Sequence, residues 1–405
     1  MKATHLAFAI ATLLSPCAFA QSDAAKQLAQ DAVIVDTHID APGVLRDHWA
    51  DLGNAADKFE FDYTKARAGG LDVAFMSIYT SPKQDEDGSA YQVANEMIDS
   101  MEELAARHPD KFALLRSPGD VDRLREGNHV LLPLGMENGA PIGDDLSRLQ
   151  FFFDRGVRYI TLAHSAPNRI SDSSYAIERK WHGLSPFGKQ VVAGMNRLGI
   201  MVDISHVSDE AARDAIAASK APVIASHSAF RHFTPGFERN ISDELAKAVA
   251  AGGGVVQIPF GTAFVNPEGA AATQAHFRAI NEFNKRNAEL KAAGKPEESR
   301  DAFDKAWAEG HPPPPTRIDA VLDQVEYAVK LIGIDHVGIG SDFDGVDGEL
   351  PDGLRTTADY PNLVAGLQAR GFKDADIRKI LGGNLLRAWT AIEACAKSGP
   401  CTGGQ

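Results

Sequence analysis

The sequence predicts an α/β protein built on a (β/α)₈ (TIM) barrel, and three observations carry this prediction. Eight short apolar runs alternate with segments that place apolar residues at helical spacing. Most runs are almost continuously apolar, which is typical of parallel strands covered on both faces. Several end in a histidine or an acid, and the C-terminal ends of the strands are where such a barrel builds its active site. The runs cover 33–38, 73–78, 130–137, 159–164, 201–206, 223–227, 254–259 and 337–342, and the clearest helical segments cover 94–106, 185–198, 208–218 and 242–251.

The first 20 residues predict a cleaved signal peptide. Lys2 gives a positive start, residues 6–14 are apolar, and Ala18-Phe19-Ala20 forms a small-x-small cleavage site. The apolar run is too short to cross a bilayer as a stable helix, and no later segment is apolar for long enough to do so. We therefore expect a secreted or periplasmic protein whose barrel domain occupies residues 21–390.

The charge of the chain excludes one class of partner. Loss of the signal peptide removes the single positive charge of Lys2 and takes the formal net charge from −14 to −15. Such an acidic protein repels phosphate groups, so we expect no nucleic-acid partner.

The first and third runs end in residues of the types that bind divalent metal ions. His38 and Asp40 lie two positions apart at the end of a strand, so both side chains leave the same face and can reach one ion. Glu137 ends an apolar run, where an isolated carboxylate would be poorly solvated. Two bound cations would hold this carboxylate in its ionised form. Two simpler interpretations stay open: a histidine hydrogen-bonded to a nearby carboxylate, and a strand-end acid that is solvated or paired with an arginine.

The fourth, fifth, sixth and eighth runs complete the set. His206 and His227 close two successive strands, and together with the other three residues they favour a site for two metal ions. His164 could polarise a carbonyl, and Asp342 could accept a proton from an activated water and pass it to a leaving amine. Alternatively, His164 is a hydrogen-bonded strand-end residue and Asp342 only orients a ligand. No serine lies in a nucleophile elbow and no cysteine is placed to attack, so metal-activated water is the expected nucleophile.

Two segments fall outside the minimal barrel. Residues 264–316 are rich in Lys, Glu and Ala and end in four prolines, which predicts a helical insertion between strands seven and eight. The simplest interpretation is a solvated helical pair that packs on the barrel; a lid, or a contact in a homodimer, is the alternative. Residues 391–405 form a tail in which Cys395 and Cys401 would make a local disulfide in an oxidising compartment, or else remain free thiols.

The order of the short motifs resembles that of a known family. The strings are Asp36-Thr37-His38-Ile39-Asp40, Gly135-Met136-Glu137-Asn138-Gly139, Asp203-Ile204-Ser205-His206, Ser226-His227-Ser228 and Gly338-Ile339-Gly340-Ser341-Asp342-Phe343-Asp344-Gly345. They resemble the membrane (renal) dipeptidase family, peptidase family M19, which belongs to the amidohydrolase superfamily. The similarity runs from about residue 33 to residue 386 and so covers nearly all of the mature chain.

The resemblance implies roles for the candidate residues. A binuclear zinc site is implied, with His38 and Asp40 on one ion, His206 and His227 on the other, and Glu137 bridging both. His164 would contact the scissile carbonyl. Asp342 would handle the proton and meet the substrate amine.

An arginine is implied for the other end of the substrate. Arg239, in Arg239-Asn240-x-x-Asp243, would hold the substrate carboxylate. Arg231 lies close by and is the second candidate. Alternatively, Arg239 is a surface residue paired with Asp243 or Glu238.

The expected function is hydrolysis of free dipeptides, including L,D-dipeptides, by a metal-activated hydroxide. The departures from the family pattern, Ile39 and Ala41 beside Asp40 and the insertion at 264–316, leave every ligand in place. Two alternatives remain. One is another amidohydrolase-type activity on a lactone, β-lactam or amide, and the other is a non-hydrolytic maturation factor on the same barrel.

Overall fold

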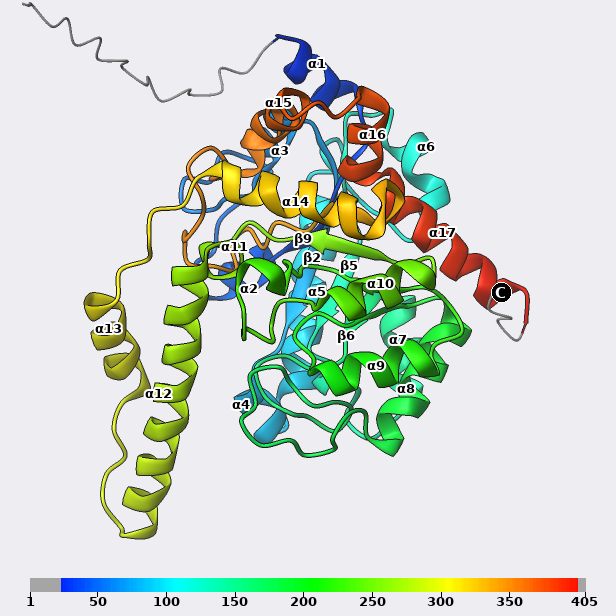
Figure 1. Ribbon diagram of the computed structural model, residues 1–405. Helices are drawn as coiled ribbons and strands as arrows, with labels where there is room; N and C mark the ends of the chain where they lie inside the picture. The colour runs from blue at the N-terminus through cyan, green and yellow to red at the C-terminus, as the bar shows by residue number, and fades with distance from the viewer. Residues whose placement is uncertain (1–22, 400–405) are drawn as a thin grey trace, which may run out of the picture.

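A closed parallel barrel forms the centre of the protein (Figure 1). The structure is a computed structural model, and it describes residues 23–399. The strands follow one another in the order β1, β10, β9, β8, β7, β6, β5 and β2, and β1 pairs with β2 to close the ring. Every pairing between these strands is parallel, and the chain is a (β/α)₈ barrel, as predicted. The strands are β1 (Ile34–Ile39), β2 (Leu71–Tyr79), β5 (Leu134–Glu137), β6 (Val157–Thr161), β7 (Met201–Asp203), β8 (Val223–Ala225), β9 (Val255–Ile258) and β10 (Val337–Ile339).

The prediction that the third run, 130–137, forms a single strand was wrong. Proline lacks the N–H group that a ladder needs, and Pro133 divides the run into β4 (Val130–Leu132) and β5. A short strand absent from the prediction, β3 (Phe112–Leu114), pairs with β4 outside the ring. Four strands also end earlier than predicted, so His164, His206, His227 and Asp342 lie on the loops that leave β6, β7, β8 and β10.

Helices surround the barrel, and the predicted ones are confirmed. α8 (Pro186–Leu198), α9 (Asp209–Ala218) and α10 (Asp243–Ala251) each begin after a serine whose side chain accepts a hydrogen bond from the first turn. The longer connecting helices are α5 (Ala90–Arg107), α7 (Ser147–Asp154), α14 (Ile318–Ile332), α15 (Tyr360–Ala369) and α17 (Asn384–Lys397), with α1 (Asp23–Asp31) preceding β1. Within residues 23–399, no helix combines the length and the apolar character needed to cross a membrane.

The barrel interior holds an apolar cluster at one end. Trp389 of α17 packs with residues of β1, β2, β4 and β6 to β9, including Phe75, Tyr159 and Met201, all of which are fully buried. Val255 starts β9 and Ala221 precedes β8, so this cluster lies at the N-terminal ends of the strands. The opposite end, where the strands finish, is the one that carries the polar residues.

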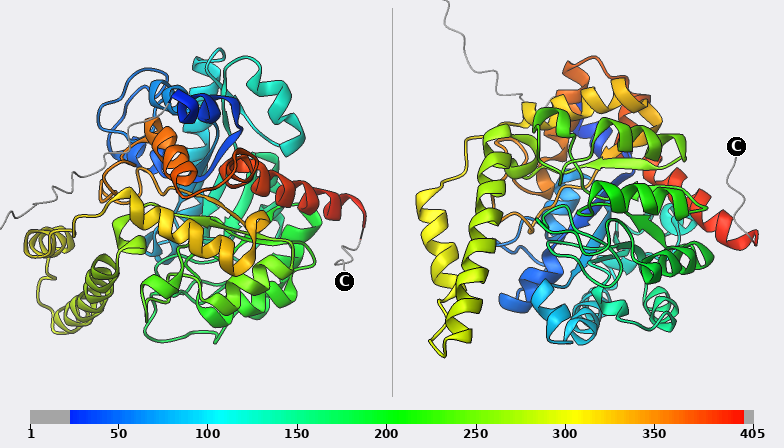
Figure 2. Two further views of the ribbon diagram at one scale, coloured as in Figure 1. Left: turned by 45° about the horizontal axis from the view of Figure 1, so that its top comes forward. Right: turned by 60° about the horizontal axis from the view of Figure 1, so that its bottom comes forward.

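The insertion between β9 and β10 is a pair of helices, as predicted. α12 (Pro267–Ala292) and α13 (Arg300–Gly310) project beyond the barrel in all three views (Figures 1 and 2). Phe283 of α12 and Phe303 of α13 hold the pair together, with ring centroids 4.7 Å apart. The first turn of α12 packs on α11 (Thr262–Val265), which follows β9 directly.

Two predictions concern residues beyond the described part of the chain. The signal peptide, residues 1–20, lies outside it. Cys395 ends up near the C-terminus of α17, but its predicted partner Cys401 is outside the described residues, so their pairing stays a prediction. The homodimer likewise stays a prediction.

Candidate active site

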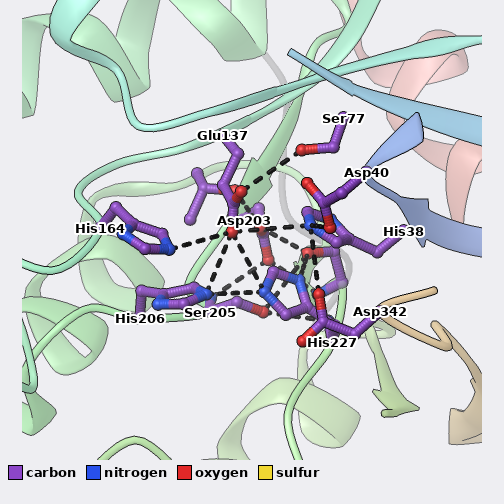
Figure 3. A network of polar contacts seen from close by, with 12 residues as sticks. His38, Asp40, Ser77, Glu137, His164, Asp203, Ser205, His206, His227 and Asp342 are labelled. Carbon is purple, nitrogen blue, oxygen red and sulfur yellow. Dashed lines mark hydrogen bonds and ion pairs between the residues drawn. The ribbon is translucent and has the colours of Figure 1, made fainter. Parts of the chain in front are cut away.

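The five predicted metal ligands converge at the C-terminal mouth of the barrel (Figure 3). Glu137 Oε1 lies at their centre, 3.5 Å from His38 Nε2, 3.1 Å from His206 Nε2 and 3.4 Å from His227 Nε2. Asp40 Oδ2 lies 3.3 Å from His38 Nε2. One carboxylate oxygen therefore faces three imidazole nitrogens that come from three different strands.

A glycine allows two of the acids to approach each other. Asp40 and Asp342 both face Gly345, where a Cβ would collide with the Asp40 carboxylate and lie 2.8 Å from Asp342 Oδ1. Asp342 Oδ1 lies 3.8 Å from His38 Nε2. The backbone N–H of Asp342 donates to the carbonyl of His38, which ties the loop after β10 to the end of β1.

The donor set fits a pair of divalent cations. His38 Nε2 and Asp40 Oδ2 are buried, and no hydrogen-bond partner for either occurs among the described residues. Three groups of ligand atoms each fall within 4.8 Å of one another: His38, His227 and Asp342; Glu137, His164 and His206; and His38, Asp40 and Glu137. Mixed imidazole and carboxylate sets of this kind bind zinc and similar ions.

The electrostatics of the cluster also favour cations. Burial lowers the pKa values of His206 and His227 well below their usual range, and nearby positive charges, Arg239 among them, act in the same direction. Both rings are therefore neutral, which is the form that binds a metal. Burial would also lower the pKa of His38, but Tyr159, Asp40 and Glu137 outweigh it and raise that pKa well above its usual range. The position between His38 and the acids therefore attracts positive charge.

The carboxylate of Glu137 is held ionised by its neighbours. Burial alone would raise its pKa, but the neighbouring His164 and His38 and the hydrogen bonds of His206 and His227 lower it well below the usual range. The alternative of pairing with an arginine does not apply to this residue. Its other oxygen accepts a hydrogen bond of 3.3 Å from Ser77 Oγ.

A relay of hydrogen bonds fixes the orientation of His227. Ser226 Oγ donates to Asp203 Oδ2 at 2.7 Å and lies 2.8 Å from His227 Nδ1, which can then donate to it. Asp203 also accepts hydrogen bonds from Thr161 Oγ1 and from the backbone N–H of Ser205. With its proton on Nδ1, His227 directs the lone pair of Nε2 toward Glu137 and the metal position.

We expect Ser226→Ala to weaken metal binding by about 10- to 100-fold, because such supporting groups fix the ring and tautomer of a ligand. Competition with a metallochromic chelator would measure the change. Ser219→Ala is the matched control, since Ser219 lies beyond α9 at the other end of the barrel. Equal affinity in the Ser226 and Ser219 variants would show that the relay does not support the ligand.

A tyrosine fixes His38 in a similar way. His38 Nδ1 lies 2.7 Å from the Tyr159 hydroxyl, and Tyr159 is fully buried beneath it. Only glycine is accommodated at Gly135, where a Cβ would collide with the Tyr159 ring. Sequence reasoning missed Tyr159, since an aromatic residue within an apolar run is expected to belong to the core.

His164 lies next to the predicted metal ligands, on the side of the cluster that faces the cavity. Its Nε2 is 3.4 Å from Glu137 Oε1, its ring centroid is 4.0 Å from that of His206, and its side chain is 19% exposed. Burial lowers the pKa of His164, and Glu137 opposes this effect. The ring is thus neutral and reaches the open side of the cluster.

Arg239 is buried, so the alternative of a surface ion pair is wrong. It is 2% exposed and donates to Ser228 Oγ at 3.1 Å and to the carbonyl of His227 at 2.8 Å. Its Nη2 also lies 3.0 Å from His206 Nε2. Arg231, the second candidate, binds both carboxylate oxygens of Asp209 instead.

A cavity of about 600 Å³ opens directly onto the cluster. Asp40, Glu137, His164, His206 and Asp342 line its floor. The walls come from several loops and from the insertion, and they include Asp47, Tyr79, Tyr175, Phe264, Phe277, Asp344 and Asp347. A larger hollow of about 860 Å³ lies near the other end of the barrel, against α9, α10 and α17, and contains none of the candidate residues.

The backbone is unusual at the cluster. His206 and Asp342 both have φ of 67°, and Asn138, which follows Glu137, has φ of 76°. Residues other than glycine rarely adopt such left-handed conformations. This turn at the end of the strand directs the side chains of His206 and Asp342 into the cavity.

Comparisons with known proteins agree with the geometry. The family profile described as membrane dipeptidase (peptidase family M19) matches residues 22–401. The chain is 30% identical to an uncharacterized dipeptidase of Schizosaccharomyces pombe over 92% of this chain and 83% of that protein. It is 29% identical to dipeptidase tcpJ of Claviceps purpurea over 84% of this chain and 73% of that protein.

Solved structures of dipeptidases have the same fold as this chain. The crystal structure of the probable dipeptidase PvdM from Pseudomonas aeruginosa superposes with a TM-score of 0.77 at 27% identity, covering 92% of this chain and 98% of that one. A dipeptidase described as a family M19 metallopeptidase superposes with a TM-score of 0.72 at 23% identity and shares the fold. The chain belongs to the membrane dipeptidase family, peptidase family M19.

Proposed function

We propose that the protein is an exported, zinc-dependent dipeptidase of the membrane dipeptidase type, with two zinc ions per chain. The observation that carries this proposal is the position of Glu137 Oε1, which lies within 3.5 Å of three imidazole Nε2 atoms at the mouth of the barrel. Family membership supports metal-dependent dipeptide hydrolysis. The N-terminal signal motif supports export.

The ligands divide into two sets that share one residue. His38 and Asp40 would hold one ion, His206 and His227 the other, and Glu137 would bridge them. Bound zinc would supply Lewis acidity, which activates water and polarises the peptide carbonyl. The chain itself keeps His206 and His227 neutral and Glu137 ionised, so these ligands need little reorganisation.

Asp342 is the group that would hold and deliver the proton. Burial raises the pKa of this carboxyl well above its usual range, the neighbouring Asp40 and Glu137 act in the same direction, and His38 and Arg239 oppose them. A carboxyl in such surroundings can accept a proton from the attacking water and give it to the departing amine. Its place on the cavity floor also lets it meet the free ammonium group of the substrate.

His164 and Arg239 would orient the substrate. His164 Nε2 faces the same carboxylate oxygen as the other histidines and is the one imidazole of the group with appreciable exposure, so it can contact the scissile carbonyl. Arg239 would read the free carboxylate, which is the feature that distinguishes a dipeptide from an internal peptide bond. A guanidinium is suited to this because it forms paired hydrogen bonds with a carboxylate.

We expect Arg239→Lys to raise KM for dipeptides by about 10- to 100-fold, because a charge-assisted hydrogen bond contributes about 1.5–3 kcal/mol. The selectivity for free dipeptides over the corresponding dipeptide amides should shrink by a similar factor. Steady-state kinetics on both substrates would measure it. Arg213→Lys, at an exposed position that pairs with Glu244, is the control. Undiminished selectivity in the Arg239 variant would mean that another group reads the carboxylate.

The preferred substrates are proposed to include L,D-dipeptides of cell-wall or nutrient origin. A panel of L,L and L,D dipeptides, with a lactone and a β-lactam as competing classes, would test the activity on the mature protein loaded with zinc. Metal analysis of the same preparation should give two ions per chain. Turnover of a lactone or an amide without any dipeptide would reject the proposal, and so would full activity with far fewer than two metal ions.

A further inference from the structure

The insertion contributes an aromatic side chain to the active-site cavity. Phe277, on α12, lines the same cavity as His164 and Asp342. Its ring stacks on that of Tyr175, with centroids 4.0 Å apart and planes inclined by 20°. Phe277 is half-buried, and therefore part of its ring remains accessible from the cavity.

Contacts of α12 on both sides of Phe277 fix the position of this residue. The Asn266 side chain caps α12, and at Gly269 a Cβ would lie 2.7 Å from the carbonyl oxygen of Thr262, so only glycine allows α12 to pack this closely on α11. Phe277 lies about two helical turns further along. On the far side, the Phe283–Phe303 contact with α13 braces the helix. The contacts of its first turn set the direction in which α12 leaves the barrel, and this places Phe277 against the cavity.

Tyr175 links this helix to the arginine. It lies on the loop after β6, its ring centroid is 6.0 Å from that of His206, and its hydroxyl interacts with the Arg239 guanidinium. Burial raises the pKa of Tyr175 to about 12, so the hydroxyl stays neutral. The guanidinium of Arg239 also lies 4.8 Å from the centroid of the Phe264 ring. Two aromatic rings, those of Tyr175 and Phe264, therefore lie beside the group proposed to bind the substrate carboxylate, and Phe277 stacks on the first of them.

Another part of the cavity wall carries charged side chains. Asp344 and Asp347 on the loop after β10, and Arg46 and Asp47 on α2 (Ala41–Asp47), are polar or charged. β10 and β1 are neighbours in the ring, whereas Tyr175 and Arg239 follow β6 and β8. One sector of the cavity is therefore aromatic and another is charged.

We propose that Phe277 and Tyr175 form the subsite for the side chain of the C-terminal residue of the dipeptide. The inference rests on the proposed dipeptidase function and on Arg239 as the carboxylate reader. The side chain of that residue leaves the carbon atom that bears the carboxylate, so it must lie among the neighbours of Arg239. On the cavity side these neighbours include Tyr175, on which Phe277 stacks. Burial of an apolar side chain against these two rings is favourable. The helical insertion thus determines specificity as well as packing on the barrel.

The test compares three dipeptides that differ in which residue carries the apolar side chain: Ala-Leu, Ala-Gly and Leu-Gly. Phe277→Ala should lower kcat/KM for Ala-Leu by about tenfold, mainly through KM, since a few methylene groups in an apolar pocket give effects of this size. For Ala-Gly and Leu-Gly the change should stay within about twofold. Phe277→Leu should retain most of the preference. Phe151→Ala, which removes a partly exposed ring from α7, is the control.

A purely structural role would give another pattern. If Phe277 only packs the insertion on the barrel, all three substrates lose activity by the same factor, and the subsite is rejected. A loss confined to Leu-Gly would assign the ring to the N-terminal residue and would equally reject it. Melting temperatures of the variants would reveal any general destabilisation.

Binding separates this inference from the proposed function. Calorimetric titration of the zinc-loaded Asp342→Asn protein, which should keep its metal but turn over about a thousandfold more slowly, should give tighter binding of Ala-Leu than of Ala-Gly. Adding Phe277→Ala to it should remove the difference. If that difference appears and disappears as expected while the unmodified protein hydrolyses no dipeptide, the subsite stands and the dipeptidase function fails. If hydrolysis occurs but the binding preference is the same in the variant, the subsite fails and the function stands. If neither dipeptide binds, both proposals are wrong.

Discussion

Asp342→Asn is expected to lower kcat by about a thousandfold, because a positioned general acid and base contributes about 10²- to 10⁴-fold. The asparagine keeps the shape of the side chain but can neither accept a proton from water nor give one to the leaving amine. The loop itself should not move, since the backbone N–H of Asp342 donates to the carbonyl of His38 whatever the side chain. Stopped-time assays with a single dipeptide would measure the loss.

The accompanying metal content decides how this loss is interpreted. Asp342 Oδ1 lies 3.8 Å from His38 Nε2, close enough for the aspartate to be mistaken for a ligand. We expect the variant to keep two ions per chain. A variant that is inactive because it lacks metal would make Asp342 a ligand rather than a proton carrier. Asp352→Asn, an exposed residue that pairs with Arg355, is the matched control and should behave as the unmodified protein.

Glu137→Gln is expected to remove metal and activity together. The carboxylate oxygen that faces His38, His206 and His227 would be replaced by a neutral amide, so neither metal position would keep a shared anionic ligand. We expect metal affinity to fall by more than about 100-fold, beyond the usual effect of a residue that only supports a ligand. Activity measured at equimolar zinc should fall in parallel, by more than about a hundredfold.

Inductively coupled plasma analysis after dialysis would measure the bound metal. Glu103→Gln, at an exposed position on α5, is the control for the loss of one negative charge. A Glu137 variant that retains two tightly bound ions would contradict the bridging role. Far-ultraviolet circular dichroism should be unchanged in both proteins, because the barrel strands do not depend on this side chain.

The candidate ligands could be predicted because parallel strands impose a simple rule on the chain. The backbone of each apolar run points the same way, so the residues that follow the runs must meet at one mouth. His206 and His227 could thus be placed together although 21 residues separate them. The rule depends only on the order of apolar and polar residues, which a single sequence displays.

The supporting residues could not be predicted in this way. Tyr159, beneath His38, lies within an apolar run where an aromatic ring is expected to be core. Phe277 reaches the cavity from a long helix of the insertion, and its position depends on how α12 packs on α11. Pro133 is different, because the interruption is visible in the sequence: a proline inside an apolar run breaks the ladder of hydrogen bonds, and here it separates β4 from β5.

The left-handed backbone at His206 and Asp342 has a consequence for the engineering of this enzyme. A residue with a β-carbon is strained in that conformation, by about 1 to 2 kcal/mol per residue, and glycine would relieve the strain. A glycine at position 206 or 342 would therefore favour the folded state but remove the imidazole or the carboxylate from the cavity. Thermal robustness and turnover make opposite demands on these two positions.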